Sequence, residues 1–211
     1  MGSFTIEGYG GVSVILRVPV RNPTEAIKQK VNGFIESNGY VSMEAENYTR
    51  SVDRPPVSWL RIPGLGRTLS GITPVPVTYP AQETAGDGPR LEYQVHLFCS
   101  GEIKIRAYLF PTLDFHYSGG LKYTISIDDE DLQIINIHEG ATNRVWEQWL
   151  RNNINLQVSK HYADRPGDHT VKFWMVDPGI VLEKLEVVTG ESKAIFLGPA
   201  ESHYQSEAEG K

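Results

Sequence analysis

The sequence predicts an all-β protein: a two-sheet antiparallel β-sandwich of jelly-roll type with one short helix. Two observations lead to this prediction. Short apolar or alternating segments recur along the chain, and clusters of glycine, proline, aspartate and serine separate them. Only residues 143–152 have a convincing helical pattern, with an apolar stripe that includes Val145 and Trp149. A regular succession of short strands and turns is typical of sandwiches.

The elements divide the chain into three parts. Residues 4–6 and 12–20 are strand candidates, but two strands do not make a stable domain. Residues 1–39 are therefore interpreted as the truncated end of a preceding β-domain, or as strands borrowed by the main body. The sandwich is expected over residues 40–198, followed by a polar tail over residues 199–211. Its predicted strands are residues 40–45, 90–98, 102–109, 122–127, 133–137, 154–161, 169–175 and 181–187.

Composition excludes several classes of function. The 20 basic and 26 acidic side chains give a net charge of −6, which argues against binding to nucleic acid or to anionic membranes. Cys99 is the only cysteine, so neither an internal disulfide nor a cysteine-rich zinc site can form. No apolar run approaches the roughly 20 residues that a membrane span requires.

The motifs of common enzymes are also missing. The sequence has no phosphate-binding glycine loop, no Gly-x-Ser-x-Gly motif and no His-Glu-x-x-His helix. Glycoside hydrolysis requires two carboxyl groups that face one another, one of them with a raised pKa. The clearest acidic run, residues 128–131, is interpreted as a solvated hairpin turn. Nothing in the sequence therefore requires a complete enzyme.

Two glutamates near residue 45 suggest a metal site. On a strand, Glu44 and Glu46 project from the same face. Carboxylates about 7 Å apart repel one another unless water, a basic partner or a cation screens them. Calcium is a hard cation that takes several oxygen ligands, so it suits this pair. The alternative is that both glutamates face solvent.

Aromatic and arginine residues in or beside the predicted loops suggest a carbohydrate-binding surface. Aromatic planes stack on the C–H faces of sugar rings, and arginines form charge-assisted pairs with acidic sugars. The alternative for Trp146 is packing of its helix onto the sandwich. The candidate carbohydrate-binding residues are Trp59, Arg61, Arg67, Tyr117 and Trp146.

Four ordered blocks carry a resemblance to a known family: residues 39–46, 62–71, 89–93 and 166–179, the last reading PGDHTVKFWMVDPG. Together they resemble the C-terminal domain of glycoside hydrolase family 115, over about residues 39–198. That family comprises xylan α-1,2-glucuronidases, whose catalytic carboxylates lie in larger upstream domains. The resemblance implies that residues 4–36 are the last strands of a linker domain, and that the parent enzyme is bacterial and secreted or periplasmic.

The same resemblance implies a sandwich similar to carbohydrate-binding modules of families 6 and 35. In those modules a Glu-x-Glu motif on the first strand helps to hold a structural calcium ion, which assigns Glu44 and Glu46 to that role. An aspartate near the final strand usually completes the site. This sequence has Glu183 at the approximate place instead, and Asp177 is an alternative oxygen donor.

Three hypotheses for function follow. The first is a non-catalytic accessory module that binds or positions glucuronoxylan for the attached catalytic domains. The second is a structural domain that braces those domains or a homodimer and has no glycan affinity of its own. The third, a stand-alone hydrolase or lyase, has the least support because no catalytic motif is present.

Overall fold

The structure is a computed structural model that describes residues 2–18, 31–82, 88–191 and 195–206. The chain divides into two compact units, one of residues 1–31 with 207–211 and one of residues 32–206. In the first unit, β1 (Gly2–Glu7) pairs with β2 (Ser13–Val18) as an antiparallel hairpin. Of the predicted strand over residues 12–20, the structure describes Ser13–Val18 as a strand, and residues 19–20 lie outside the described part of the chain.

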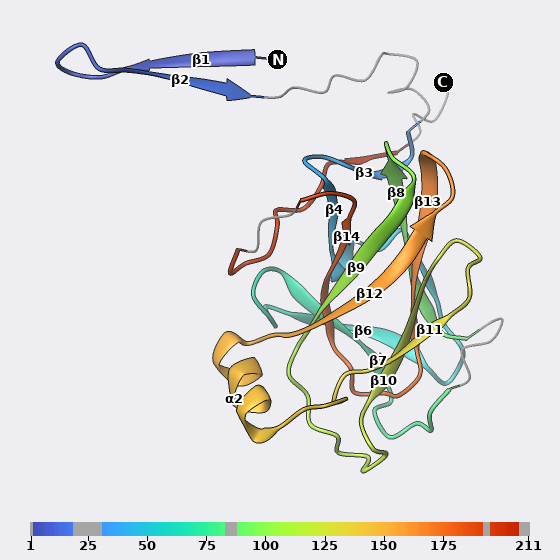
Figure 1. Ribbon diagram of the computed structural model, residues 1–211. Coiled ribbons are helices and arrows are strands. Elements are labelled where there is room, and N and C mark those ends of the chain that lie inside the picture. The colour runs from blue at the N-terminus through green and yellow to red at the C-terminus, as the bar shows by residue number, and fades with distance from the viewer. Residues whose placement is uncertain (1, 19–30, 83–87, 192–194, 207–211) are drawn as a thin grey trace. The chain divides into compact units, whose positions relative to one another are not determined.

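The second unit contains the remaining elements. They are β3 (Gly33–Ile35), β4 (Tyr40–Glu44), the 3-10 helix η1 (Ala45–Asn47), β5 (Arg50–Val52), β6 (Ser58–Pro63), β7 (Ser70–Val75), β8 (Arg90–Leu97), β9 (Gly101–Leu109), β10 (Lys122–Ile127), β11 (Gln133–Asn136), α2 (Asn143–Asn152), β12 (Asn155–Ala163), β13 (Gly167–Met175), β14 (Leu182–Val188) and β15 (Tyr204–Gln205). Figure 1 shows them as a β-sandwich with α2 at one end.

Two sheets make the sandwich, as predicted. One has the strand order β11-β10-β13-β8-β3-β15, with β5 also paired to β8. The other has the order β12-β9-β14-β7-β6, with β4 also paired to β14. All of these pairs are antiparallel except β3 with β8, which is parallel. The side chains between the sheets are apolar, and Tyr93, Tyr123 and Phe173 are the largest that are fully buried.

The ends of the sandwich differ from the predicted boundaries. The compact unit begins at Asn32 rather than at residue 40, because β3 pairs with β8. It also extends through most of the predicted tail, because β15 pairs with β3 and Tyr204 packs edge-on against Phe34. Residues 199–206 therefore belong to the sandwich, and residues 207–211 lie outside the described part of the chain.

A glycine allows β3 to approach β8 closely. Gly33 has a φ of +113°, and a Cβ atom at this position would lie 2.4 Å from the carbonyl oxygen of Gln94. Any side chain would therefore separate the two strands. The contact that joins the start of the sandwich to its core depends on this residue.

The predicted helix is confirmed at both ends. α2 begins after Thr142, whose side-chain oxygen accepts a hydrogen bond from the backbone N–H of Val145 at 3.3 Å. It ends at Asn153, which adopts the left-handed conformation common at helix C-termini. None of the described helices is long and apolar enough to cross a membrane.

Candidate functional site

The first predicted metal ligand is already paired with a cation from its own chain. Glu44 ends β4, and its Oε1 lies 2.9 Å from Nζ of Lys184 on the neighbouring strand β14. Both side chains are almost fully buried, with exposed fractions of 6% and 4%. Thr68 donates a hydrogen bond to Oε2 of Glu44 at 2.6 Å. Lys184 therefore supplies positive charge beside this carboxylate.

Glu46 does not share a strand face with Glu44. The strand stops at Glu44, and η1 turns Glu46 toward Arg61 on β6, whose Nε donates to it at 2.8 Å. Burial alone would raise the pKa of Glu46, but hydrogen bonds from Ser70 and Arg61 outweigh it and lower the pKa. Its carboxylate is therefore stabilised in the ionised form by a local partner.

Glu183 lies at an irregularity in the pairing of β14 with β9, where the register shifts between Leu182 and Lys184. Such a bulge changes the direction of the extra residue. Oε2 of Glu183 accepts a hydrogen bond from the backbone N–H of Arg67 at 3.3 Å, while buried Oε1 has no partner. Gly66 approaches so closely that a Cβ there would lie 2.6 Å from Oε2 of Glu183.

Burial raises the pKa of Glu183 to about 7. The N–H and the charge of Arg67 oppose this shift, as does Lys184, whereas the nearby carboxylate of Glu44 adds to it. The raised pKa agrees with the absence of a hydrogen-bond donor at Oε1 of Glu183, because a desolvated carboxyl group favours its neutral form.

Among the described residues, the four predicted calcium ligands do not form one cluster. Asp177, the fourth candidate, accepts a hydrogen bond from the backbone N–H of Lys122 at 2.8 Å. Among the described residues, only one group of three side chains brings its ligand atoms within 4.8 Å of one another, and it contains none of Glu44, Glu46, Glu183 and Asp177. With Glu44 and Glu46 already bound to basic side chains, these residues do not fit a shared calcium ion.

The pKa of Glu183 predicts a pH-dependent stability. Between its ordinary pKa of 4.5 and about 7, the folded chain holds a proton that the unfolded chain releases. The contribution of Glu183 to the free energy of unfolding is therefore fully present below pH 4.5. It falls by about 3 kcal/mol as the pH rises to 7. We expect Glu183→Gln to flatten the dependence of the unfolding free energy on pH in this window, and to stabilise the chain at pH 8. Urea denaturation at several pH values measures this.

A matched control for that variant is Glu102→Gln, because Glu102 is exposed. It should leave the pH profile unchanged. An identical slope for Glu183→Gln and the native chain between pH 4.5 and 7 would contradict the assignment.

The five predicted carbohydrate-binding residues come from four parts of the chain, since Trp59 and Arg61 share β6. Trp59 and Arg61 lie on β6, Arg67 in the β6–β7 loop, Tyr117 in the β9–β10 loop and Trp146 on α2. No hydrogen bond or ring contact in the described structure joins any two of them. The structure therefore does not assemble the five into one surface by direct contact.

Two of these residues, Trp59 and Arg67, make contacts within the sandwich. Trp59 is half-buried and packs against Phe173 of the core, with ring centroids 6.3 Å apart. Arg67 donates to the backbone carbonyl of Asn152 at 2.9 and 2.7 Å and to that of Phe196, whose ring lies under its guanidinium at 4.2 Å. It thus joins the β6–β7 loop, the end of α2 and residues 195–198.

Trp146 and Tyr117 lie on α2 and in the β9–β10 loop. Trp146 is half-buried and meets Trp149 edge-on, with ring centroids 6.0 Å apart. Tyr117 is 94% exposed, and its backbone is in the left-handed region with a φ of +54°. Of the five predicted residues, Tyr117 presents the most accessible ring.

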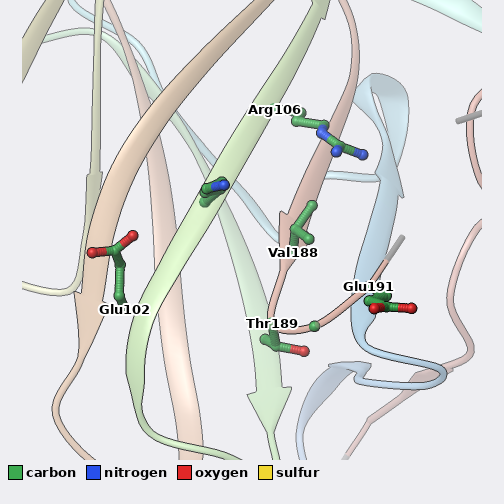
Figure 2. Close-up of a pocket in the computed structure, with 7 residues that line it drawn as sticks. Glu102, Arg106, Val188, Thr189 and Glu191 are labelled. Carbon is green, nitrogen blue, oxygen red and sulfur yellow. The ribbon is translucent and has the colours of Figure 1, made fainter. Parts of the chain in front are cut away.

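Two open hollows lie elsewhere on the sandwich. The first has a volume of about 560 Å³ and lies where β9 and the end of β14 meet (Figure 2). Lys104 and Arg106 bring positive charge to it, and Glu102 and Glu191 bring negative charge. Arg106 also pairs with Glu186, whose carboxylate is fully buried, at 3.3 Å.

The second hollow has a volume of about 520 Å³. We call it the acidic hollow because four carboxylates line it: Asp128, Asp129, Glu130 and Asp164. Asp128 and Glu130, from the predicted solvated turn, each contact a buried histidine: His169 for Asp128, at 2.6 Å, and His161 for Glu130. Sequence analysis missed these pairs because the partners are far apart in the chain and no local spacing links them. The acidic run is thus partly built into the sandwich rather than wholly solvated.

The fold and the two hollows define the class of protein: a β-sandwich with open, polar hollows on its surface. A model of the glycosyl hydrolase family 115 C-terminal domain matches residues 33–201. The chain therefore belongs to this family of C-terminal domains, which confirms the resemblance drawn from the four sequence blocks. No curated protein sequence matches the chain.

Three solved structures are similar to parts of this chain. One is a family GH115 4-O-methyl-α-glucuronidase with specificity for decorated arabinogalactans, with 15% identity and a TM-score of 0.56. The match covers 83% of this chain and only 20% of that enzyme. A family 35 carbohydrate-binding module from Clostridium thermocellum has 10% identity and a TM-score of 0.47, over 72% of this chain and 98% of that one. The C-terminal family 6 module of a laminarinase from Zobellia galactanivorans has 14% identity and a TM-score of 0.45, over 71% and 98%.

Proposed function

We propose that this chain is the non-catalytic accessory module of a secreted or periplasmic bacterial α-glucuronidase, and that it binds or positions an acidic polysaccharide such as glucuronoxylan for the upstream catalytic domains. Membership in the family 115 C-terminal domains carries this proposal. The catalytic domains would supply the hydrolytic carboxylates, and the sandwich would supply a surface for the polymer.

The hollow in Figure 2 is suited to an acidic sugar. Lys104 is exposed on β9, and Arg106 lies two residues further along the same strand, so both side chains project from the same face of the sheet. A uronate carboxylate can accept charge-assisted hydrogen bonds from such groups. Its hydroxyl groups can pair with the neighbouring Glu102, Thr189 and Glu191.

Neither hollow has the features of a hydrolytic site. A general acid needs a carboxyl group whose neutral form is favoured by its surroundings. Burial raises the pKa of Glu183, but this carboxyl group lines neither hollow. In the acidic hollow, Asp164 is exposed and is bound by Arg165 through both oxygens at 3.0 Å. These observations support an accessory role.

Affinity electrophoresis tests the proposal. We expect the 211-residue chain to be retarded by glucuronoxylan, and Lys104→Ala to weaken binding by about tenfold, because a lost charge-assisted hydrogen bond is worth about 1.5 kcal/mol. Arg144→Ala, which removes an exposed positive charge on α2, is the matched control and should bind normally. Tyr117→Ala separately tests the predicted stacking residue.

The alternative is a bracing or dimerisation domain. One observation favours it: Ile195, Phe196 and Leu197 are more than half exposed beside the junction that Arg67 makes. If no xylan, pectin or arabinogalactan retards the chain, glycan binding is contradicted and this alternative gains support. A dimer of the full enzyme that dissociates when the module is deleted would then identify the role.

A further inference from the structure

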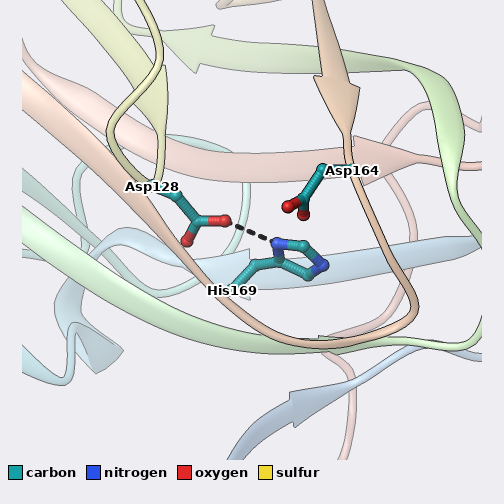
Figure 3. A group of neighbouring side chains, drawn as sticks. All are labelled: Asp128, Asp164 and His169. Carbon is teal, nitrogen blue, oxygen red and sulfur yellow. Dashed lines mark hydrogen bonds and ion pairs between the residues drawn. The ribbon is translucent and has the colours of Figure 1, made fainter.

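Three ligand-bearing side chains converge beside the acidic hollow, although they come from three segments. Asp128 lies in the turn after β10, Asp164 directly follows β12, and His169 is on β13. Figure 3 shows the carboxylates of Asp128 and Asp164 near the imidazole ring of His169. One ligand atom from each residue lies within 4.8 Å of the others.

His169 is buried, with an exposed fraction of 2%, and faces the core side of its strand like Val171 and Phe173. Its Nε2 lies 2.8 Å from the carbonyl oxygen of Arg165. A carbonyl oxygen can only accept a hydrogen bond, so Nε2 carries the proton and donates it. In the neutral ring, the lone pair is therefore on Nδ1.

That Nδ1 atom lies 2.6 Å from Oδ2 of Asp128, with Asp164 also close by. A carboxylate oxygen and a bare ring nitrogen are both acceptors, so the contact requires a shared proton or a metal ion that both groups bind. Histidines that bind metals usually donate their other ring N–H to a carbonyl or carboxylate, as His169 does to Arg165.

Asp128 is held in position for this role. Its Oδ1 accepts a hydrogen bond from the backbone N–H of Thr170 at 2.8 Å, which leaves Oδ2 directed at the histidine. Nζ of Lys172 binds the backbone carbonyl of Asp128 at 2.6 Å and Oδ1 of Asp129 at 3.1 Å. Lys172 therefore pairs with Asp129 and with the backbone of Asp128, and it does not neutralise the carboxylates of Asp128 and Asp164 in the hydrogen bonds described.

Asp164 can exchange its present partner, Arg165, for a metal ion. Its side chain is 65% exposed and pairs with Arg165, which is 59% exposed. Exposed pairs of this kind contribute at most about 1 kcal/mol, so a metal ion can replace Arg165. The open hollow next to the cluster gives solvent access for water ligands.

We propose that Asp128, Asp164 and His169 form a binding site for a divalent transition-metal ion such as Zn²⁺, with water from the hollow completing its coordination. One imidazole nitrogen and two carboxylate oxygens favour such an ion over calcium, which prefers oxygen ligands alone. The site is independent of the predicted calcium ligands and of the proposed glycan surface.

Isothermal titration of the metal-depleted 211-residue chain with zinc chloride at pH 7 tests the site. We expect one equivalent to bind, and Asp164→Asn to weaken binding by more than about tenfold. Asp129→Asn is the control: it removes the same charge from the same hollow, but Asp129 is not one of the three ligands. It should bind zinc within twofold of the native chain, as estimated for a residue that makes no metal contact.

The folded state should survive these changes, since both aspartates are exposed. A higher melting temperature with zinc for the native chain, but not for Asp164→Asn, is the expected second readout. Absence of saturable binding at about 1 mM zinc would overturn the proposal. Equal affinity in the two variants would overturn it too, because the zinc would be bound elsewhere.

Discussion

Replacing Lys184 with methionine is expected to lower the free energy of unfolding by about 3–5 kcal/mol, because it leaves a buried carboxylate without its counter-charge. Nζ of Lys184 lies 2.9 Å from Oε1 of Glu44, and both side chains are almost fully buried. Nζ of Lys184 also donates to the backbone carbonyl of Pro199 at 2.9 Å, so the variant would loosen the last segment of the sandwich as well. Urea denaturation at pH 7 measures the loss.

Two further variants make this result specific. Lys160→Met removes an exposed lysine paired with Glu102 at 3.6 Å and should change stability by less than about 0.5 kcal/mol. Adding Glu44→Gln to Lys184→Met should recover part of the loss, since no unpaired charge then remains buried. A chain as stable as the native one after Lys184→Met would contradict the role given to this pair.

The same experiments test the predicted calcium ion. Because Lys184 already neutralises Glu44, we expect EDTA and subsequent calcium to leave the melting temperature of the native chain unchanged. Calcium that restored the stability of Lys184→Met would indicate instead that Glu44 can take an ion once the lysine is removed.

Replacing Phe173 with alanine is expected to cost about 3–5 kcal/mol, as other buried phenylalanines do. Phe173 is fully buried on β13, stacks on Tyr123 at 4.9 Å and meets Trp59 at 6.3 Å. Its removal would leave a cavity that connects both sheets, and two aromatic neighbours would lose their contact with it.

Tyr117→Ala is the control for that variant, since an exposed ring contributes little to stability. It should change the unfolding free energy by less than about 0.5 kcal/mol. A loss below about 1 kcal/mol for Phe173→Ala would indicate that the core repacks around the cavity, and would contradict the central position assigned to this ring.

Local pattern predicted eight strands of the sandwich, β4 and β8 to β14, but not β5, β6 and β7, so Trp59 and Arg61 lie on a strand that was not predicted. The eight predicted strands follow from alternation and from turn residues, which act over a few positions. The bounds of α2 were predicted from its apolar stripe, and the structure adds the reason in the caps formed by Thr142 and Asn153. The ends of the sandwich were not predicted, because β3 and β15 are very short and depend on each other.

The candidate site was predictable only in part, because its contacts are not local. Strand alternation placed Glu44 and Glu46 on one face, but the chain leaves the strand at Glu44 and forms a 3-10 turn. No spacing in the sequence indicates that Lys184 lies across from Glu44. The metal-ligand cluster likewise joins His169 to Asp128, 41 residues earlier in the chain.

The pairing of β3 with β15 has a mechanical consequence. They are the first and last strands of the sandwich in the sequence. They run antiparallel, with Gly33 opposite Gln205 and Phe34 opposite Tyr204. Tension applied to the sandwich through residues 32 and 206 therefore peels this pair apart one rung at a time, as a zipper opens, instead of loading its bonds together. The sandwich should yield first at this corner, while the strands around Phe173 still resist the pull.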